Sequence, residues 1–593
     1  MTMQVLFNGQ VLVRPGAYTK IDASQFSNTA LNGLGIVGLI GEADGGQPHT
    51  VNSFFASQDV KSFYLSGDLV EAANMAANPS NDPRIPSGAQ LIVCYKVNNS
   101  TKSSLTTAPF VFSSLQYGVA MNSISMAISA GGGGFVVTIS TLDAFNNLVQ
   151  EVSPTLGSVG KFSIQYTGTG AAATLTTSAT QLVIAVTAPG VADGLTLNYA
   201  DYPILSQLLQ AISVTGKYTV AALVTNTNSV ATNTLDQVTA IDIKTAVTSI
   251  FTKNADVANW VNTNSQIIGA TFTLNAVPYV GPLVQTSLTG GTRGTSANSD
   301  WVTGFTALST TRINQMIPLA SADATTAQGT FTIVSILAAL VAYAKQASST
   351  AGQNEVQGWA GISGTKTAII TAANLQNSEH LQLFGEKSKL ARTSDGAVVF
   401  FPEWSTAVVA AGMRAGAPLG EPLTWKYANV LGVSSDASWS ETNNSDVVAL
   451  TLNGVDVLNT INGRGFRFDK MVTTFTKLNN DAYTEETIVQ IWKLVAYNLR
   501  QALQDAFVGR GGTLQRVGTV PGVVAAVMQP LKDVGAITDS VVNGTRLNAW
   551  RNVVFALNGD TMTVSVTVTP TPGINYVLTT IVLVPAQITS AAA

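Results

Sequence analysis

The first pattern that could do chemistry is a run of glycines near the start of the chain. Gly33, Gly35 and Gly38 have the G-x-G-x-x-G spacing of a dinucleotide-binding turn, which needs a strand before the first glycine and a helix opening at the last. After Gly38, three further glycines and Pro48 follow within ten residues, so no helix can begin there to hold a pyrophosphate. We therefore predict a buried strand at Leu34–Ile40 followed by a turn, and no nucleotide cofactor.

The residue types that usually carry catalysis or bind metals are sparse. The two histidines, His49 and His380, lie in a turn and in a polar segment, and neither has the spacing of a zinc site. The single cysteine, Cys94, lies in an apolar strand, where a packed thiol is expected rather than a nucleophile. The adjacent carboxylates Glu485 and Glu486 point apart on a helix and suit the positive end of its dipole. We therefore predict no catalytic, cofactor-binding or metal-binding residue and no enzymatic activity.

The composition favours a protein whose surface is largely covered. Hydrophobic residues make up 46% of the 593 positions and charged residues only 11%, against roughly 25% charged in ordinary soluble proteins. A Ser/Thr/Asn-rich exterior would explain the same figures. The net charge of −4 argues against a nucleic-acid partner. Between Arg464 and Arg551, however, eleven Lys/Arg stand against seven Asp/Glu, which indicates either a footprint for an acidic protein surface or an ordinary solvated face.

The sequence shows no targeting segment. The longest apolar run, residues 331–344, is shorter than the roughly 20 residues that span a bilayer, so we predict a buried helix there. The N-terminus lacks the charged and apolar regions of a secretory signal, and a single cysteine fits folding in a reducing cytoplasm. We expect neither membrane insertion nor secretion.

The elements fall into distinct regions along the chain. Strands and helices alternate in residues 23–102 and 206–400, where the pattern predicts a helix over 236–251 and a strand at 367–370. Between these regions, residues 103–205 alternate as short strands separated by glycine-rich turns. That texture predicts an all-β insertion in an α/β domain.

The last third of the chain carries the sharpest local signals. Thr484 can cap a helix whose apolar residues recur every three or four positions until Gly509 ends it. Residues 550–568 alternate as a hairpin around Asn558-Gly559. After a proline-glycine break, residues 574–584 form one more apolar strand with no partner after it, and the extended N-terminal segment raises the same problem. Unpaired strands aggregate, so we predict that both are added to the sheet of a neighbouring subunit.

The order of several short motifs resembles that of the tail sheath proteins of contractile-tailed bacteriophages. Residues 14–18, Arg-Pro-Gly-Ala-Tyr, are similar to the family's N-terminal S-P-G-V-Y signature, and residues 35–46 are similar to the strand and glycine turn that follow it. Leu288–Thr295 resembles the family's L-x-G-G-x-D-G-x loop, with Arg293 where an acid is usual. Residues 455–467 resemble the element that opens the family's most regular domain. The resemblance covers the chain outside the β-rich insertion, although the family's proline-rich segment before the last domain is matched only in part.

The resemblance implies an α+β multidomain fold with a C-terminal α/β sheath domain whose terminal strands are swapped between subunits. The middle α/β domain is then discontinuous, and the all-β insertion faces outward. The expected parts are an N-terminal linking arm (1–22), a middle α/β domain (23–102 and 206–400), a β-rich outer insertion domain (103–205), a C-terminal tube-proximal domain (401–572) and a C-terminal arm strand (573–593).

In this family the subunit polymerises as a six-fold helical tube around an inner tail tube and contracts to drive that tube through the host envelope during genome delivery. The implied partners are other copies of the chain, the inner tail tube protein, and baseplate and tail terminator proteins, in a virion tail assembled in the host cytoplasm. The implied residues are the inter-subunit arm residues Val5, Phe7, Val11, Val13, Tyr576, Leu578, Thr580, Val582 and Val584, the hinge residues Pro15, Gly16, Pro570, Pro572 and Gly573, and the candidate tube-facing residues Lys493, Arg500, Arg510 and Lys532.

Two other interpretations stay open at this point. The chain is also compatible with the sheath of another contractile injection system, of the bacteriocin or secretion type. A phage surface protein that binds glycans is the second alternative, suggested by the polar β-rich region. Residues 103–205 contain no tryptophan, however, and an aromatic platform for a sugar ring is therefore harder to build there.

Overall fold

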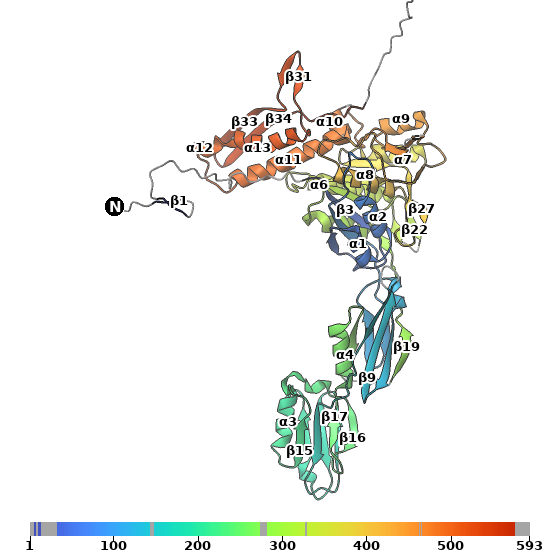
Figure 1. Ribbon diagram of the computed structural model, residues 1–593, viewed down its shortest axis with the longest axis vertical. Coiled ribbons are helices and arrows are strands. Elements are labelled where there is room, and N and C mark those ends of the chain that lie inside the picture. The colour runs from blue at the N-terminus through green and yellow to red at the C-terminus, as the bar shows by residue number, and fades with distance from the viewer. Residues whose placement is uncertain are drawn as a thin grey trace, which may run out of the picture.

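The computed structural model shows an elongated molecule built from three parts (Figure 1). An α/β domain forms the centre, a C-terminal domain extends from one side of it, and a β-rich insertion extends away from it as two successive domains. The structure describes residues 5–7, 10–12, 33–142, 147–272, 282–326, 329–461, 463, 465–478 and 480–575.

The α/β domain is organised around a six-stranded sheet. The strand order is β25-β24-β21-β3-β5-β4, in which all neighbours are parallel except the antiparallel edge strand β4. The inner strands are buried along almost their whole length because helices cover both faces of the sheet, and their few polar residues, Lys96, Gln315 and Gln357, are buried with them. The strands are β3 (Ile36–Gly41), β4 (Val51–Phe54), β5 (Leu91–Lys96), β21 (Gln315–Pro318), β24 (Gln357–Gly361) and β25 (Leu381–Phe384).

Strand β3 contains Gly38, the last glycine of the G-x-G-x-x-G pattern, and ends at Gly41. A Cβ atom added at Gly38 would lie 2.9 Å from the side chain of Ile313, and one added at Gly41 would lie 2.6 Å from that of Leu319. These glycines therefore let neighbouring side chains lie directly against the strand. After β3 the chain enters a turn rather than a helix. The prediction of a buried strand followed by a turn is confirmed.

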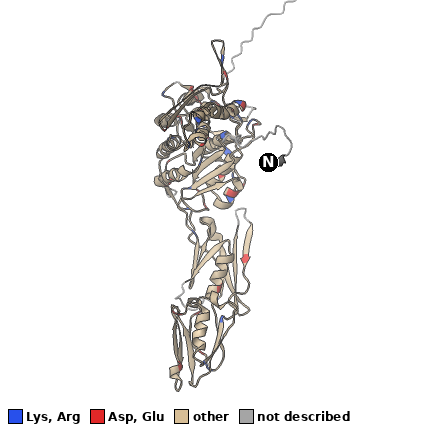
Figure 2. Ribbon diagram, turned by 90° about the vertical axis from the view of Figure 1, so that its left-hand side faces the viewer, with Lys and Arg blue, Asp and Glu red and all other residues tan. Residues whose placement is uncertain are grey.

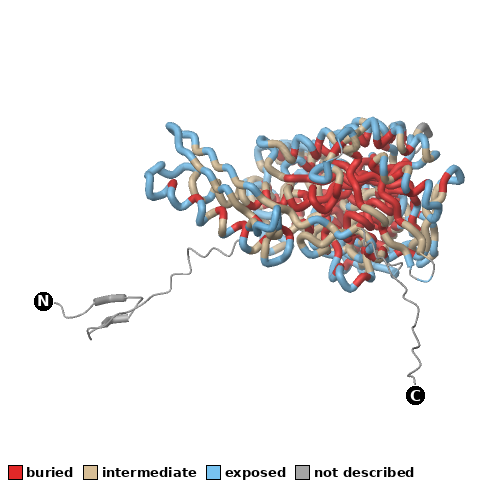
Figure 3. The backbone as a smooth tube through the Cα atoms, turned by 90° about the horizontal axis from the view of Figure 1, so that it is seen from above, coloured by how far each residue is buried: buried red, intermediate tan, exposed pale blue. Residues whose placement is uncertain are grey.

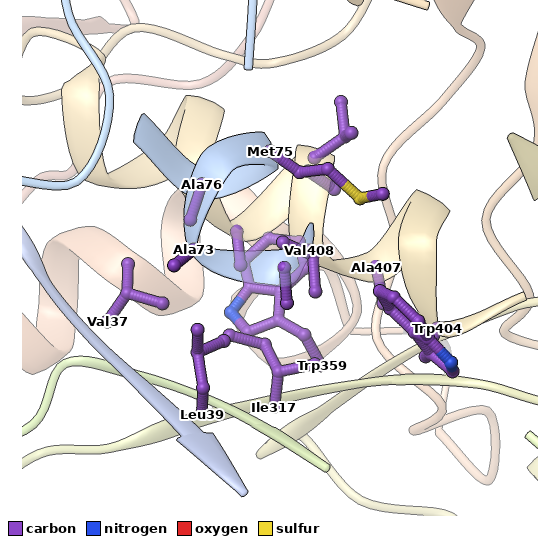
Figure 4. Packing of buried hydrophobic residues seen from close by; sticks show 14 of the residues in the cluster. Val37, Leu39, Ala73, Met75, Ala76, Ile317, Trp359, Trp404, Ala407 and Val408 are labelled. Carbon is purple, nitrogen blue, oxygen red and sulfur yellow. The ribbon is translucent and has the colours of Figure 1, made fainter. Parts of the chain in front are cut away.

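Two hydrophobic cores lie on the two faces of the sheet. Helices α2 and α8 close one core, in which Trp359 and Trp404 are buried (Figure 4). Helices α5, α6 and α7 close the other. Figure 3 shows the buried residues gathered in this domain. The helices are α2 (Asp68–Ala77), α5 (Asn298–Ala307), α6 (Ile333–Ala347), α7 (Lys366–Gln376) and α8 (Trp404–Gly416).

Smaller elements complete the α/β domain. They include two three-stranded sheets, in the orders β27-β26-β28 and β20-β23-β22, and the two-stranded sheet β29–β30. Their bounds are α1 (Ser57–Tyr64), β20 (Ser296–Ala297), β22 (Ala324–Thr326), β23 (Gly329–Phe331), β26 (Lys387–Ala391), β27 (Val398–Phe401), β28 (Gly432–Ser434), α9 (Asn444–Leu452), β29 (Leu458–Ile461) and β30 (Gly465–Phe468).

The β-rich insertion consists of two domains, one inserted into the other, and each has its own core. The inner insertion domain combines the sheets β10-β9-β8-β19 and β18-β7-β6 with helix α4. The outer insertion domain combines the sheets β15-β11-β17 and β14-β13-β12-β16 with helix α3. The bounds are β6 (Ser104–Thr107), β7 (Phe110–Ser114), β8 (Ser125–Gly131), β9 (Gly134–Leu142), β10 (Leu148–Val152), β11 (Phe162–Tyr166), β12 (Ala173–Thr177), β13 (Gln181–Val186), β14 (Leu195–Asn198), α3 (Leu205–Ser213), β15 (Tyr218–Ala222), β16 (Val238–Asp242), β17 (Thr248–Ile250), α4 (Lys253–Asn264), β18 (Ile268–Phe272) and β19 (Leu283–Ser287).

The insertion is longer than the 103–205 that we predicted. It continues to the end of β19, because β17 pairs with β11 and β19 pairs with β8. The predicted helix over 236–251 is wrong, since this segment forms β16 and β17. The predicted strand at 367–370 is also wrong. It lies in α7, whose first turn Thr365 caps by accepting a hydrogen bond from the backbone N–H of Ala368 (3.4 Å).

The chain enters and leaves the insertion at one place. The backbone N–H of Thr101 donates to the carbonyl of Thr292 (3.1 Å). The Asn98 side chain donates to the carbonyl of Arg293 (2.6 Å) and to a carbonyl of the turn after β3 (2.8 Å). Arg293 also forms an ion pair with Glu42 in that turn (3.0 Å). The two crossing strands are therefore joined to each other and to the α/β domain.

The C-terminal domain has a separate core between two long helices and a hairpin. We expected this domain to begin at residue 401, but α8 packs on β21 and β24 of the α/β domain, so the separate core begins with α11. The predicted helix and the hairpin at 550–568 are confirmed, with Glu485 rather than Thr484 at the N-cap. The bounds are α10 (Asp481–Thr484), α11 (Glu486–Phe507), α12 (Leu514–Val517), α13 (Val520–Asp533), β31 (Ser540–Val542), β32 (Thr545–Leu547), β33 (Trp550–Asn558) and β34 (Thr561–Val568).

Candidate functional site

Hairpin β33–β34 gives the C-terminal domain a two-stranded sheet. Gly559 takes a positive φ of 63° in the turn, as the Asn558-Gly559 pair predicts. Along β34, Met562, Val564 and Val566 pack toward α11 and α13, while the residues between them face outward. No other strand of the described chain pairs with β33 or β34, so both long edges of this sheet are open. An open edge beside an apolar face is what strand addition from another chain requires.

The predicted arm residues lie mostly outside the described residues. Val5, Phe7 and Val11 lie in β1 (Val5–Phe7) and β2 (Gln10–Leu12), which pair with each other as an antiparallel hairpin. Leu34, at the start of the main described range, packs in the core of the C-terminal domain. The chain therefore enters its folded part at the domain that carries the open sheet. The arm and hinge residues outside the described ranges are Val13, Pro15, Gly16, Tyr576, Leu578, Thr580, Val582 and Val584.

The C-terminal hinge residues Pro570, Pro572 and Gly573 follow directly after β34. Pro570 forms a bridge with Ile537, and the backbone N–H of Gly573 donates to Oε1 of Glu485 (3.3 Å). Both contacts hold this segment to the C-terminal domain. The residues beyond it therefore start from the same domain as the open edges of β33–β34.

A second hairpin, β31–β32, projects from the domain and is held at its base by Asp539 (Figure 1). The Asp539 carboxylate accepts from Nζ of Lys532 (2.7 Å), from Nη2 of Arg546 (2.6 Å) and from the backbone N–H of Ala549 (2.9 Å). The hydrogen bonds from Lys532 and Arg546 hold the pKa of Asp539 well below its usual range. Lys532, a predicted tube-facing residue, is therefore engaged within its own subunit. We did not predict this hairpin, although Asn543-Gly544 is the same turn signal as Asn558-Gly559 in β33–β34.

Lys493 does not lie on the surface, in contrast to the prediction. Only 1% of the residue is exposed, and Nζ donates to the carbonyl of Val356 (2.6 Å) and to the side chain of Gln357. Burial lowers the pKa of Lys493 to about 7, with the nearby carboxylate of Glu355 acting in the opposite direction. The N-terminal half of α11 packs on the α/β domain, and the helical periodicity of the sequence does not reveal that second contact.

The other two predicted cations differ in their surroundings. Arg500 pairs with Glu355 of the α/β domain (2.8 Å). Arg510 follows the end of α11 and is exposed, and none of the ion pairs among the described residues includes it. Of the four candidates, Arg510 is therefore the one whose charge is directly available to a partner.

A buried ion pair joins the C-terminal domain to the α/β domain. Nε of Arg414 in α8 donates to Oε1 of Glu486 in α11 (2.7 Å), and Nη2 donates to Oε2 (2.5 Å). The side chains are 2% and 0% exposed, and Nη1 of Arg414 donates to the carbonyl of Glu421 (2.9 Å). We predicted Glu486 only as a favourable charge at a helix start. The signal for this pair was Arg414 itself, the one charged residue in the otherwise small and apolar helix α8.

The cysteine and both histidines lie within the described residues, each in surroundings of its own. Cys94 is buried, and burial raises the pKa of its thiol. His380 is buried too, and burial lowers the pKa of its ring. His49 contacts the hydroxyl of Tyr95 (3.2 Å) and the side chain of Asn99 (2.7 Å). Across the described ranges, no three His, Cys, Asp or Glu side chains gather as a metal site would require. A search of the same residues finds no helix with the length and hydropathy to cross a membrane.

Comparison with known proteins finds relatives along almost the whole chain, although no family model matches it. The chain is 24% identical over 579 residues to a protein of Enterococcus phage phiEF24C that is provisionally named a tail sheath protein, covering 95% of this chain and 96% of that one. It is 24% identical over 537 residues to the tail sheath protein of Bacillus phage SP01, covering 88% of each. It is 23% identical over 536 residues to the tail sheath protein of Staphylococcus phage Twort, covering 85% of this chain and 87% of that one.

Two solved structures share the fold. The sheath tail protein from Listeria innocua has a TM-score of 0.53 and 13% identity, covering 91% of this chain and 93% of that one. The sheath tail protein from Desulfitobacterium hafniense has a TM-score of 0.51 and 13% identity, covering 88% of this chain and 90% of that one. The mixed α and β multidomain fold is therefore shared along nearly the full length of all three chains.

Proposed function

We propose that this chain, a homologue of the phage tail sheath proteins, is the structural subunit of a contractile tail sheath. The observation that carries the proposal is the match to the tail sheath proteins of SP01 and Twort, which extends over 88% and 85% of the chain. Copies polymerise as a six-fold helical tube around an inner tail tube and contract to drive it through the host envelope during genome delivery. The phage origin of these relatives favours a phage tail over a bacteriocin or secretion sheath.

Strand addition is the link that we propose between copies. The two open edges of β33–β34 lie in the domain at which both ends of the folded chain are held. The terminal arms, residues 1–22 and 573–593, supply the strands that complete this sheet in adjacent subunits. A strand of about ten residues adds about five backbone hydrogen bonds, each contributing roughly 0.5–1.5 kcal/mol, together with apolar burial. Such a link persists while the domains that it connects change their orientation.

Contraction then consists of a rearrangement about the hinges. Pro15 and Gly16 serve the N-terminal arm, and the C-terminal arm pivots at the end of the segment Pro570–Gly573. Because Pro570 and Gly573 contact their own domain, the C-terminal swivel begins after Gly573. The energy is stored at assembly in a metastable extended lattice and released as more surface is buried. This mechanism uses no catalytic residue, so the protein acts as a structural component rather than an enzyme.

The C-terminal domain faces the tube in this proposal. Arg510 is the exposed candidate contact, while Arg500 and Lys532 would contribute from within their own ion pairs. Lys493 is no longer a candidate because it is buried. Each exposed ion contact contributes about 0–1 kcal/mol, which permits the sheath to release the tube as it contracts. The further partners are baseplate and tail terminator proteins at the two ends of the sheath, in a virion tail assembled in the host cytoplasm.

Removal of the C-terminal arm tests this proposal. In negative-stain electron microscopy we expect hollow helical tubes from the full chain and none from a variant that lacks residues 574–593. The truncated protein should remain folded by circular dichroism, because neither of the described residues of the deleted segment, Ile574 and Asn575, belongs to the core of the C-terminal domain. A variant that lacks only residues 590–593 is the matched control and should form tubes like the full chain.

Two outcomes would contradict the proposal in different ways. Tubes of normal length from the variant without residues 574–593 would show that the C-terminal arm does not link the copies. A full chain that forms no tube under any assembly condition would contradict the sheath function itself.

A further inference from the structure

The inner insertion domain presents a sheet with two open edges. In the order β10-β9-β8-β19, β10 and β19 are the outermost strands, and neither has another described strand on its outer side. Both edges carry exposed apolar side chains. Leu148 and Val152 of β10 are 70% and 57% exposed, and Val284 of β19 is 80% exposed. Strand edges with these properties pair with a further strand when one is presented to them.

The two edges match each other in direction and in level. Every neighbouring pair in this sheet is antiparallel, so β10 and β19 run in opposite directions. Val152 lies opposite Thr138, and Thr138 lies opposite Ala127 on the next strand. On β19, Leu283 pairs with Ile128 and Thr286 pairs with Met126. Val284 and Gln285 therefore lie opposite Ala127. Val152 and Val284 therefore stand at the same level on the two edges. A second copy placed beside the first in the same orientation would present β19 to β10 as an antiparallel strand.

The surface of the insertion lacks the charges that would keep identical copies apart. Residues 103–292 contain seven Asp/Glu, four Lys and no Arg, and Figure 2 shows how few coloured residues this part of the molecule carries. Several of these charges are used internally. Lys161 pairs with Asp256 (3.0 Å), and Glu151, the one acid of β10, accepts a hydrogen bond from the backbone N–H of Gln266 (2.8 Å). The two strands that would meet, β10 and β19, carry one charged residue between them, Glu151, so no like charges oppose their pairing.

We propose that neighbouring copies are joined at a second place, by antiparallel pairing of β10 of one copy with β19 of the next. The contact joins two different edges, so it is heterologous and repeats from copy to copy into a ring or a helix. It rests on the proposed function in one respect, namely that identical copies stand side by side in a polymer. It differs from the terminal arms in that both strands belong to folded domains.

Engineered cysteines test this pairing, because the chain's one natural cysteine is buried. The test variant is Val152→Cys/Val284→Cys. Within one copy the two positions are separated by three strand spacings, about 14 Å, which is too far for a disulfide. A disulfide between them therefore joins two copies. After mild oxidation of assembled tubes, we expect a ladder of dimers, trimers and higher multimers on a non-reducing gel, which collapses to the monomer on reduction.

Matched variants separate this contact from chance collisions. The single variants Val152→Cys and Val284→Cys should not form multimers beyond dimers. Val214→Cys/Val284→Cys should give no ladder, because Val214 is equally exposed, at 80%, but lies in the outer insertion domain. A charge variant, Val152→Lys/Val284→Lys, should give fewer and shorter tubes than the control Val191→Lys/Val214→Lys.

The outcomes distinguish this inference from the sheath proposal. Tubes of normal form without a cysteine ladder would overturn the pairing of β10 with β19 and leave the sheath function intact. Equal tube yield and length from the two lysine variants would overturn it as well. A full chain that never polymerises would instead contradict the proposed function and, with it, this contact.

Discussion

The buried pair of Arg414 and Glu486 predicts how firmly the C-terminal domain is fixed to the α/β domain. Glu486→Gln preserves the shape of the side chain but removes the counter-charge of the Arg414 guanidinium. Only 2% of the Arg414 side chain is exposed, so water cannot replace that charge. Both hydrogen bonds of the pair lose a charged acceptor, while the bond to the carbonyl of Glu421 remains. Breaking a buried ion pair in this way costs about 3–5 kcal/mol. We expect this loss to appear at the contact between α8 and α11.

Hydrogen exchange followed by mass spectrometry measures this loss locally. Because each 1.4 kcal/mol is a factor of ten, the amides of α8 and of the first turns of α11 should exchange roughly 100- to 4,000-fold faster in Glu486→Gln. The matched control is Arg392→Ala, which breaks an ion pair with Asp395 whose side chains are 44% and 49% exposed. This control should change the exchange rates by about fivefold or less, because solvent screens an exposed ion pair. The double variant Arg414→Met/Glu486→Met should recover most of the loss, because an apolar pair leaves no charge buried.

Two results would refute this reasoning. Exchange of α8 and α11 in Glu486→Gln within a few-fold of the natural protein would mean that the guanidinium is solvated despite its burial. A double methionine variant as labile as Glu486→Gln would mean that packing, rather than charge, holds the two domains together.

Three further predictions concern single charged residues. Burial raises the pKa of Glu386 from 4.5 to about 8, so the stability that its proton provides is complete below pH 4.5 and is lost as the pH rises through 8. Glu386→Gln should therefore match the natural protein near pH 4.5 and become progressively more stable than it as the pH rises toward 8, with no further gain above that pH, measured by urea unfolding; parallel pH profiles would contradict this. Asp539→Asn should speed amide exchange in residues 540–547 at neutral pH, and the difference should vanish as the pH falls through the low pKa of Asp539; unchanged exchange at pH 7 would show that the carboxylate does not hold the hairpin. Arg510→Glu should weaken co-sedimentation of the assembled chain with the tube protein that we propose as its partner by about fivefold or less, and complete loss of binding would mean that the contact is not a simple exposed ion pair.

The helix α11 and the hairpin β33–β34 could be predicted from the sequence because their signals are local. Apolar residues at helical spacing and the Asn558-Gly559 turn depend on neighbours within a few positions. Residues 236–251 were mistaken for a helix because their strands pair with β11 and β12, much earlier in the chain. Pairing with distant strands also determines where the insertion ends, since β19 pairs with β8. Composition alone does not show this pairing, so the predicted end at residue 205 was too early.

The candidate site was predictable in outline but not in its individual side chains. The sequence predicted the long helix and the hairpin of the C-terminal domain, while the pairing of the terminal strands with neighbouring copies stays a prediction. It did not show that the α/β domain covers Lys493. The sequence pattern of an amphipathic helix is the same whether one or two faces of the helix are packed, so it does not reveal a buried lysine on the second face. The pairing of Arg414 with Glu486 joins residues of two different helices, and no spacing rule connects them.

The chain leaves the α/β domain at Thr101 and returns at Thr292, and these two residues are hydrogen-bonded to each other. Because the two ends of the insertion lie side by side, the insertion occupies the place of one short surface loop of the α/β domain. The entropy of closing a loop grows slowly with its length, so each doubling of the inserted sequence costs only about 0.6 kcal/mol. Any domain whose own ends lie close together satisfies the same geometry. During evolution this insertion can therefore be enlarged, trimmed or exchanged by recombination at this one place while the α/β domain and the C-terminal domain keep their sequence. For the same reason it is a suitable position at which to graft a foreign protein for display.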